Sequence, residues 1–213
     1  MSDLPLFPLN TVLFPGAPIH LHIFEERYRQ MMDFCITERQ PFGVVLIAEG
    51  REAQGPLARP HLVGCAAHIQ QVEPLADGRM NLVAYGKERF HINSLDEGKP
   101  YLTGDVSPFP LIWRQSAELS QVQNELASFA ARYIRLLSRA GEVDTSAINW
   151  PDDVESLTFL AAHLLRIAPE KKQELLAQKE ALSLMQLMLK IYKEEVSVMQ
   201  TLPERSQGPF SYN

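Results

Sequence analysis

The stretch HLVGCAAHIQQVEPLADGRMNLVAY, residues 61–85, decides the fold of the first half of the chain. His61–Val72 is a long strand candidate, and Arg79–Tyr85 is a second one. Between them stands Asp77-Gly78, a dipeptide typical of tight hairpin turns because glycine tolerates a positive φ. The stretch therefore predicts a β-hairpin.

Shorter strand candidates lie on both sides of this hairpin. Leu4–Leu9 contains Pro5 and Pro8, which cannot donate to a ladder, and so predicts an edge strand or an extended arm. Gly86 is expected to break the second hairpin strand. A helix is expected to open at Glu25 and to end before Pro41. The further strands expected are Ile19–Phe24, Phe42–Ala48, Arg89–Asn93 and Tyr101–Ser107, with a loop over Glu49–Pro60. Six or seven short strands with one early helix predict a small curled sheet or a partly open barrel.

The second half of the chain has helical periodicity. Eleven of the 15 prolines and nine of the 11 glycines lie in residues 1–110, so long helices have room after them. Apolar stripes predict one helix over about residues 119–136, ended by Gly141, and a second that begins at Asn149-Trp150 with Pro151 in its first turn. Pro169 restarts the chain, and a long stripe runs from Leu182 to Met199. We expect an α+β protein with a β subdomain over residues 1–113, a helical subdomain over 114–202 and a flexible tail over 203–213.

Charge and composition exclude several classes of protein. The formal net charge is −6, from 20 basic and 26 acidic residues, and no basic block stands out, which disfavours nucleic-acid binding. No apolar run is long enough to cross a membrane. No Lys or Arg precedes Arg27, so the start lacks the pattern of a secretory signal. Cys35 and Cys65 are 30 residues apart and predict two reduced, partly buried thiols. A cytoplasmic protein is expected.

A family resemblance rests on several motifs of the first half. These are LPLFPL at 4–9, LFPG at 13–16, Phe24-Glu25-x-Arg27-Tyr28, FGV at 42–44, VGCA at 63–66, DGR at 77–79 and Gly86-x-x-Arg89-Phe90. In this order and spacing they resemble the N-terminal, substrate-binding domain of Lon protease. In the second half, KQELL at 172–176 and the helix that follows are also similar. The resemblance covers about residues 4–195.

The resemblance implies a PUA-like β pseudo-barrel followed by a helical subdomain, and a module that helps to recognise unfolded or tagged polypeptides. The sequence has no Gly-x-x-x-x-Gly-Lys-Ser/Thr motif: at Gly86-Lys87, Asn81 stands where the first glycine belongs and Glu88 where the hydroxyl belongs. The resemblance therefore implies a free-standing member without the ATPase and protease domains.

Metal and catalytic sites have little support in the sequence. His20-x-His22 places two imidazoles on one face of a strand, a conceivable metal pair, but no third ligand is visible nearby, so ordinary surface histidines are expected. No Gly-x-Ser-x-Gly or His-Glu-x-x-His motif occurs. Ser183 and Lys190 would lie about 10 Å apart along a helix, too far for a catalytic dyad. We expect no catalytic residue, no metal and no cofactor.

Partner-binding candidates are aromatic or charged residues near turns and the ends of elements. Aromatic side chains on loops suit a binding surface, although core packing is the alternative for most of them. Glu25 and Arg27 have the alternative of stabilising the helix start and forming an ion pair with the sheet. The candidates are Phe14, Phe24, Glu25, Arg27, Tyr28, Tyr85, Arg89 and Phe90.

Three functions remain open at this stage. The first is a non-catalytic module that binds a polypeptide or a partner protein, as an adaptor or a substrate-recognition protein in proteolysis. The second is an enzyme of unrecognised type with a cleft between the sheet and the helices. The third is RNA binding through the PUA-like fold, which the acidic charge disfavours.

Overall fold

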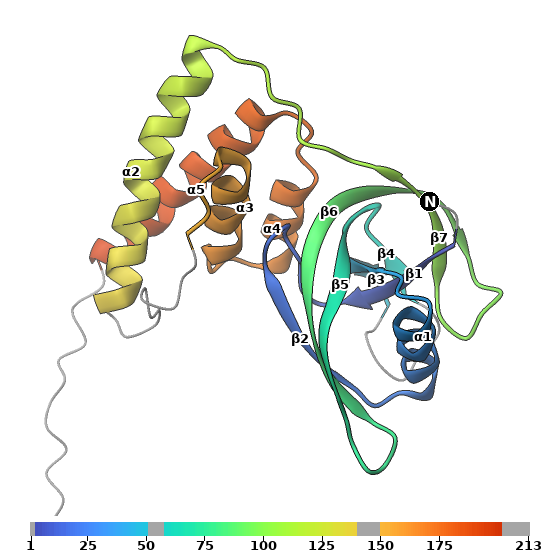
Figure 1. Cartoon of the computed structure of the whole chain (residues 1–213). Coiled ribbons are helices and arrows are strands. Elements are labelled where there is room, and N and C mark those ends of the chain that lie inside the picture. The colour runs from blue at the N-terminus through green and yellow to red at the C-terminus, as the bar shows by residue number, and fades with distance from the viewer. Residues whose placement is uncertain (1–2, 51–57, 140–149, 202–213) are drawn as a thin grey trace, which may run out of the picture. The chain divides into compact units, whose positions relative to one another are not determined.

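The computed structural model describes residues 3–50, 58–139 and 150–201, and these residues form five helices and seven strands (Figure 1). The α+β class predicted from the sequence is confirmed. The strands are β1 (Leu4–Leu9), β2 (Pro18–Ile23), β3 (Phe42–Glu49), β4 (Arg59–Pro60), β5 (Val63–Pro74), β6 (Met80–Asp96) and β7 (Thr103–Pro108). The helices are α1 (Glu26–Thr37), α2 (Ala117–Arg139), α3 (Val154–Leu164), α4 (Pro169–Leu176) and α5 (Ala181–Thr201).

The sheet closes on itself through its first strand. Its order is β1-β7-β6-β5-β3-β4, and β1 also pairs with β3, so the hydrogen-bonded path returns to its start. The β1–β3 pair is parallel, whereas the other pairs are antiparallel. The β5–β6 hairpin predicted around Asp77-Gly78 is present, and Gly78 has a φ of 80°, as such turns require. β2 lies off the closed path and pairs with β6.

The prediction that residues 4–9 form an edge strand or an arm is wrong, because β1 pairs on both of its sides. The Leu6 N–H donates to Leu102 on the β7 side at 2.8 Å, so the nitrogen of Pro8 also faces that side and that of Pro5 faces β3. The β7 pairing ends at Pro5, and the β3 pairing begins at Leu6. Each proline nitrogen therefore points to a side on which β1 has no strand partner at that position. No ladder hydrogen bond is lost.

The predicted break at Gly86 is also wrong, since β6 runs without interruption from Met80 to Asp96. Gly86 is a point of close approach instead. A Cβ there would lie 2.3 Å from the carbonyl oxygen of Phe14 and 3.0 Å from the Cys65 sulfur. Its N–H donates to Ala17, and its carbonyl accepts from Gly16. Glycine fits this position because neighbouring atoms leave no room for a side chain, and not because the strand ends there.

The core of the sheet is built around Phe90. Its ring occupies the space above two glycines, because a Cβ on Gly43 or on Gly64 would lie 2.6 Å from the ring. Phe90 is 3% exposed and belongs to a buried cluster inside the sheet. The other members of that cluster are Leu4, Leu6, Val45, Ala66, Ile92, Leu102 and Val106.

The helix starts agree with the sequence at α4 but not at α3. Pro169 occupies the first turn of α4, as predicted. α3 begins at Val154 rather than next to Pro151, because the Asp153 side chain accepts a hydrogen bond from the Ser156 N–H at 2.8 Å and caps the helix there. α1 begins one residue after the predicted Glu25 and ends at Thr37, before Pro41.

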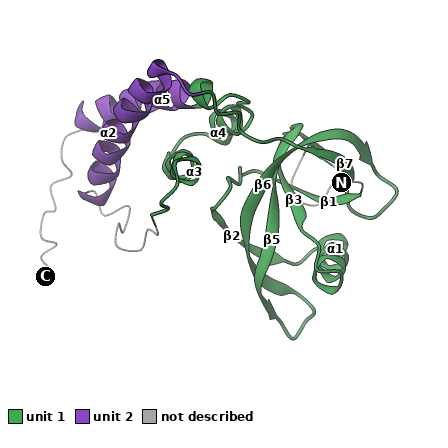
Figure 2. Ribbon diagram, turned by 45° about the horizontal axis from the view of Figure 1, so that its top comes forward, with its two compact units in different colours: residues 1–114, 150–184 green, residues 115–149, 185–213 purple. Residues whose placement is uncertain are grey.

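The chain divides into two compact units, coloured separately in Figure 2. Unit 1 comprises residues 1–114 and 150–184, and unit 2 comprises residues 115–149 and 185–213. Unit 1 thus contains α3, α4 and the first turn of α5 in addition to the sheet. Within unit 1, backbone hydrogen bonds join the segment after β7 to the start of α5. The Ile112 N–H donates to the Lys179 carbonyl, and the Ile112 carbonyl accepts from the Ala181 N–H, both at 2.9 Å.

Unit 2 contains α2 and the remainder of α5, which run side by side in the same direction. The Glu118 carboxylate accepts from the Gln186 amide at 2.8 Å. Seven residues further along both helices, Glu125 forms an ion pair with Lys193 at 2.7 Å. The buried rings of Tyr133 and Tyr192 meet edge to face at 5.3 Å. Tyr133 and Tyr192 both belong to the apolar stripes predicted for these two helices.

Both cysteines are free and fully buried, at 1% and 0% exposure for Cys35 and Cys65. Burial raises the pKa of each thiol to about 12, so both are protonated at neutral pH. The expected helix end at Gly141 and the expected tail over 203–213 lie outside the described residues. None of the described helices has the length and apolar character needed to cross a membrane.

Candidate functional site

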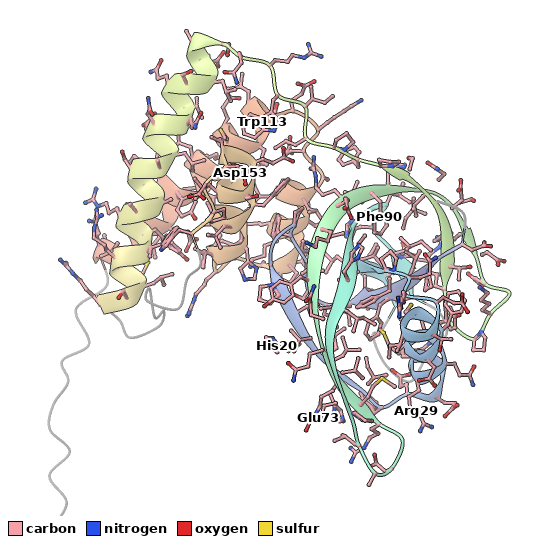
Figure 3. The ribbon with its side chains drawn as sticks, in the orientation of Figure 1. His20, Arg29, Glu73, Phe90, Trp113 and Asp153 are labelled. Atoms are coloured by element: carbon pink, nitrogen blue, oxygen red, sulfur yellow. The ribbon has the colours of Figure 1, made fainter. Side chains whose placement is uncertain are left out.

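An open hollow of about 380 Å³ lies on the face formed by β2, β6 and β5, which are adjacent in Figure 1. His20 and Glu73 mark this face in Figure 3, on the side of the sheet away from α1. We call this depression the outer hollow. Six of its lining residues are His20 and His22 from β2, Asn81 and Val83 from β6, and Gln71 and Glu73 from β5.

Strand register explains why these side chains share one face. His22 is opposite Asn81, which in turn is opposite Glu73, and the next row outward joins His20, Val83 and Gln71. Since alternate residues of a strand point to opposite faces, both rows emerge on the same side. The residues between them, such as Leu21 and Leu82, are half-buried or buried.

A chain of hydrogen bonds crosses the hollow along the first row. The Asn81 amide N–H donates to the Glu73 carboxylate at 3.1 Å, which fixes the orientation of that amide. The Asn81 oxygen is then the acceptor for His22 Nδ1–H at 2.7 Å, and His22 Nε2 is left as an acceptor 3.4 Å from the Arg79 guanidinium. The row therefore defines Nδ1 as the His22 nitrogen that donates to Asn81.

Arg79 closes this row at the hairpin end. Its guanidinium Nε donates to Asp77 at 2.6 Å, and its backbone N–H donates to the same carboxylate at 3.1 Å. The backbone hydrogen bond, followed by the side-chain bond and the guanidinium charge, lowers the pKa of Asp77. Asp77 neutralises the charge of Arg79. Among the residues named on this face, Glu73 therefore carries the remaining formal charge.

Phe24 and Tyr85, two of the predicted partner-binding residues, lie exposed beside the outer hollow. Phe24 follows β2 directly, is 50% exposed, and stacks on His22 with ring centroids 6.1 Å apart. Tyr85 is 39% exposed and stands opposite Pro18 on β2 and His68 on β5. The two aromatic side chains therefore belong to opposite ends of the β2–β6 pair.

Three other aromatic candidates are buried. Phe14 is 0% exposed, Tyr28 is 5% exposed, and Phe90 fills the core described above. The Tyr28 ring packs on Phe7 with centroids 4.3 Å apart. The alternative of core packing therefore describes where these three side chains lie in the structure.

Glu25 and Arg27 form a partly buried pair at the start of α1. Arg27 Nη2 lies 3.0 Å from the Glu25 carboxylate, and Arg27 Nε donates to the same oxygen at 3.1 Å. The guanidinium also lies over the Tyr28 ring, 4.6 Å from its centroid. Glu25 occupies the N-cap position of α1 but makes no side-chain capping bond. Glu25 directly follows Phe24 in the chain, and Arg27 comes two residues after Glu25.

Arg89 is buried and links the sheet to the end of α4, both in unit 1. It is 4% exposed, and its Nη1 donates to the carbonyls of Leu176 at 2.7 Å and Gln178 at 2.6 Å. The guanidinium also lies over the rings of Phe109 and Phe159. Burial lowers the pKa of Arg89 to about 10, so it stays charged at neutral pH.

The two histidines of β2 share one face, as the sequence predicted. In the described part of the chain, no group of three or more His, Cys, Asp or Glu side chains is placed to hold a metal ion. The sequence reasoning missed Gln71, Glu73 and Asn81. The signal that could have found Glu73 and Asn81 is the Asp77-Gly78 turn, because counting outward from a hairpin turn sets which residues are opposite.

The family model for the ATP-dependent protease La (LON) substrate-binding domain matches residues 3–194. The chain belongs to this family. The matched model describes the substrate-binding part of the protease and not a catalytic part. The resemblance drawn from the sequence motifs is thereby confirmed.

Curated relatives of this Lon substrate-binding domain are full-length proteases. Lon protease of Methylocella silvestris is 23% identical over 91% of this chain, and the match covers 24% of that protein. Lon protease of Paraburkholderia phytofirmans is 26% identical over 98% of this chain and 27% of its own length. The chain thus spans about a quarter of the length of the relatives it matches.

Two solved structures show the same fold. A Lon N-terminal domain protein from Xanthomonas campestris is 25% identical, with a TM-score of 0.64, and covers 89% of this chain and 98% of its own. The N-terminal domain of a Mycobacterium avium complex Lon protease is 18% identical, with a TM-score of 0.68, over 91% and 99% of the two chains. Each match runs beyond the sheet into the helical part of the Lon fold.

Proposed function

We propose that this chain binds polypeptide substrates in proteolysis, as an adaptor or substrate-recognition protein for a Lon-type protease. The observation that supports this most strongly is the match to the LON substrate-binding domain over residues 3–194. The exposed aromatic residues beside the outer hollow suit a surface that binds polypeptides. The net charge of −6 gives no support to RNA binding.

A binding experiment tests the first part of this proposal. A reduced and alkylated, permanently unfolded protein carries a fluorescent label, and its anisotropy is followed as the chain is added. We expect saturable binding of the unfolded form and no binding of the same protein in its native, disulfide-bonded form. Equal responses to both forms, or none to either, would contradict polypeptide recognition.

The adaptor role needs a second measurement. The degradation rate of the same unfolded protein by Lon protease from the same cell is measured with and without the chain. We expect the chain to raise this rate at limiting substrate concentration, because it concentrates the polypeptide near the protease. A rate that falls as the chain is added would show sequestration instead and would overturn the adaptor role.

We place the contact surface around Phe24 and Tyr85, with Glu25 and Arg27 at its margin. The double variant Phe24→Ser, Tyr85→Ser should weaken binding of the unfolded protein about tenfold, because two exposed aromatic contacts are removed. Leu95→Ser is a matched control, since Leu95 is a 40% exposed apolar residue of the same strand as Tyr85. Equal weakening by the control would argue against this location.

A further inference from the structure

The strand β2 has one free edge. One side of β2 pairs with β6 over Met80–Tyr85, and no described strand pairs with its other side. Figure 1 shows β2 at the margin of the sheet, next to β6. Such an edge presents unpaired backbone groups, which can accept one more strand.

The hydrogen-bond pattern shows which residues face that edge. Gly86 N–H donates to the Ala17 carbonyl at 3.0 Å, so Ala17 points its carbonyl towards β6. In an antiparallel ladder the direction alternates from residue to residue. Ile19 and Leu21 therefore point their backbone groups towards β6, whereas His20 and His22 point theirs to the free edge. Two N–H and two C=O groups are thus presented there.

The edge carries none of the usual protection against strand addition. Edge strands are commonly blocked by charged side chains, by proline within the strand or by a bulge. β2 has the sequence PIHLHI, with no Lys, Arg, Asp or Glu. Its proline, Pro18, stands at the first position, and its register with β6 is regular over all six residues.

The two faces beside the edge differ, and this defines the kind of strand that fits. On the outer face, the side chains of His20 and His22 border a hollow whose formal charge comes from Glu73. On the other face, Ile19 and Leu21 are half-buried. An added strand would place polar or basic side chains beside the histidines and apolar side chains beside Ile19 and Leu21.

We propose that β2 binds an extended segment of polypeptide as an additional strand, with alternating apolar and basic or polar side chains. The backbone of His20 and His22 supplies the hydrogen bonds, and the outer hollow receives alternate side chains. This inference rests on the proposed polypeptide-binding function and specifies how the segment is held. Main-chain recognition of this kind tolerates many sequences, because the bonds involve groups that nearly every residue has.

Backbone methylation of a peptide tests this mode directly. The probe is a short labelled peptide in which valine alternates with lysine, together with two derivatives: one N-methylated on the lysines, the other on the valines. Since alternate N–H groups of a strand point to opposite edges, only one set can face β2. We expect one derivative to bind about tenfold more weakly and the other to bind nearly as well as the parent. Equal affinities of the two derivatives would overturn strand addition.

Two variants at one position provide a test from the side of the protein. His20→Pro removes an N–H that faces the free edge and leaves the ladder to β6 intact, whereas His20→Ala removes the imidazole and keeps the N–H. We expect His20→Pro to bind the parent peptide about tenfold more weakly than His20→Ala. Circular dichroism and thermal unfolding verify that both variants fold. If His20→Pro does not fold, the methylated peptides decide the question.

The outcomes separate this inference from the proposed function. Binding of unfolded protein that is unaffected by His20→Pro would refute strand addition and leave polypeptide binding intact. No binding of unfolded protein or peptide by the wild-type chain would refute both. Sedimentation of the wild-type chain and of His20→Pro tests whether a second copy of this chain occupies the edge. If the wild-type chain is a dimer and His20→Pro is a monomer, the edge binds a second copy and the proposal is overturned.

Discussion

Arg89 illustrates how a single side chain holds two elements together. A buried guanidinium is costly unless its hydrogen-bond donors are satisfied. Here Nη1 reaches two carbonyls at the end of α4, whereas the buried Nη2 has no hydrogen-bond partner among the described residues. The same end of unit 1 is fastened by Gln173, whose amide donates to the Val63 carbonyl at 2.9 Å. Both contacts join the sheet to residues more than 80 positions away in the chain.

Replacing Arg89 should therefore destabilise the protein. Arg89→Met keeps most of the apolar volume but leaves two carbonyls without their donor, which should lower the free energy of unfolding by about 3 kcal/mol. Urea denaturation measures this change. Arg59→Met is the control, because Arg59 is exposed and its pair with Glu49 is long, at 3.7 Å. A loss as small as that of the control would show that Arg89 does not fasten α4.

His163 should make stability depend on pH. Burial, and next the charge of Lys172, lower the pKa of His163 below its ordinary 6.5. The unfolded chain therefore binds a proton that the folded chain resists, so stability is lost as the pH falls below about 6.5. His163→Asn keeps the backbone carbonyl that accepts from Lys172 Nζ. We expect its free energy of unfolding to fall less than that of the wild type between about pH 7 and about pH 5. Parallel pH profiles of the two proteins would contradict this.

At the scale of the element, the start of α3 is set by a cap rather than by a proline. Asp153→Ala removes the acceptor for the Ser156 N–H and should lower the midpoint of thermal unfolding by a few degrees. Asp152→Ala changes a neighbouring exposed carboxylate and should leave the midpoint close to that of the wild type. Circular dichroism during heating measures both. Equal shifts in the two variants would indicate a general charge effect instead of a cap.

Local elements could be predicted from the sequence, whereas their long-range pairings could not. The Asp77-Gly78 hairpin, the start of α4 at Pro169 and the bounds of β1 follow from turn chemistry and from short-range patterns. The position of β1 between β3 and β7 depends on pairing across the whole sheet, so its prolines suggested an edge. The prediction of a strand break at Gly86 is wrong for the same reason, since the atoms that crowd this glycine belong to Phe14 and Cys65.

The candidate site was predictable to a similar extent. An aromatic residue near a turn gives no local sign of whether it lies in the core, so Phe14 and Phe90 could not be told from Phe24. Histidines two residues apart on a strand must share a face, and this rule placed His20 and His22 correctly. The hydrogen-bonded row with Asn81 and Glu73 also requires the pairing partners of β6, which no local pattern supplies.

At the scale of the whole molecule, unit 1 combines the sheet with α3 and α4. A fragment of residues 1–113 would lack both partners of Arg89 as well as Gln173. We expect this fragment to unfold at a markedly lower urea concentration than the full chain, since a buried charge would lose its partners. Equilibrium denaturation of the two proteins compares them. A cooperative transition of the fragment at the same midpoint would show that the sheet is stable without α3 and α4.

The closure of the sheet through β1 also bears on the order of events during synthesis. β1 is synthesised before the other strands of the sheet, but its partner residues on β7 follow about 100 positions later. The carbonyls that accept from Arg89 come about 75 positions after those. A ribosome that has released only the β1–β2 region has therefore exposed strands whose partners do not yet exist. The nascent sheet must wait, with apolar surface uncovered, until the residues around Gln178 emerge. We therefore expect correct folding to need rapid completion of the chain or a chaperone during that interval.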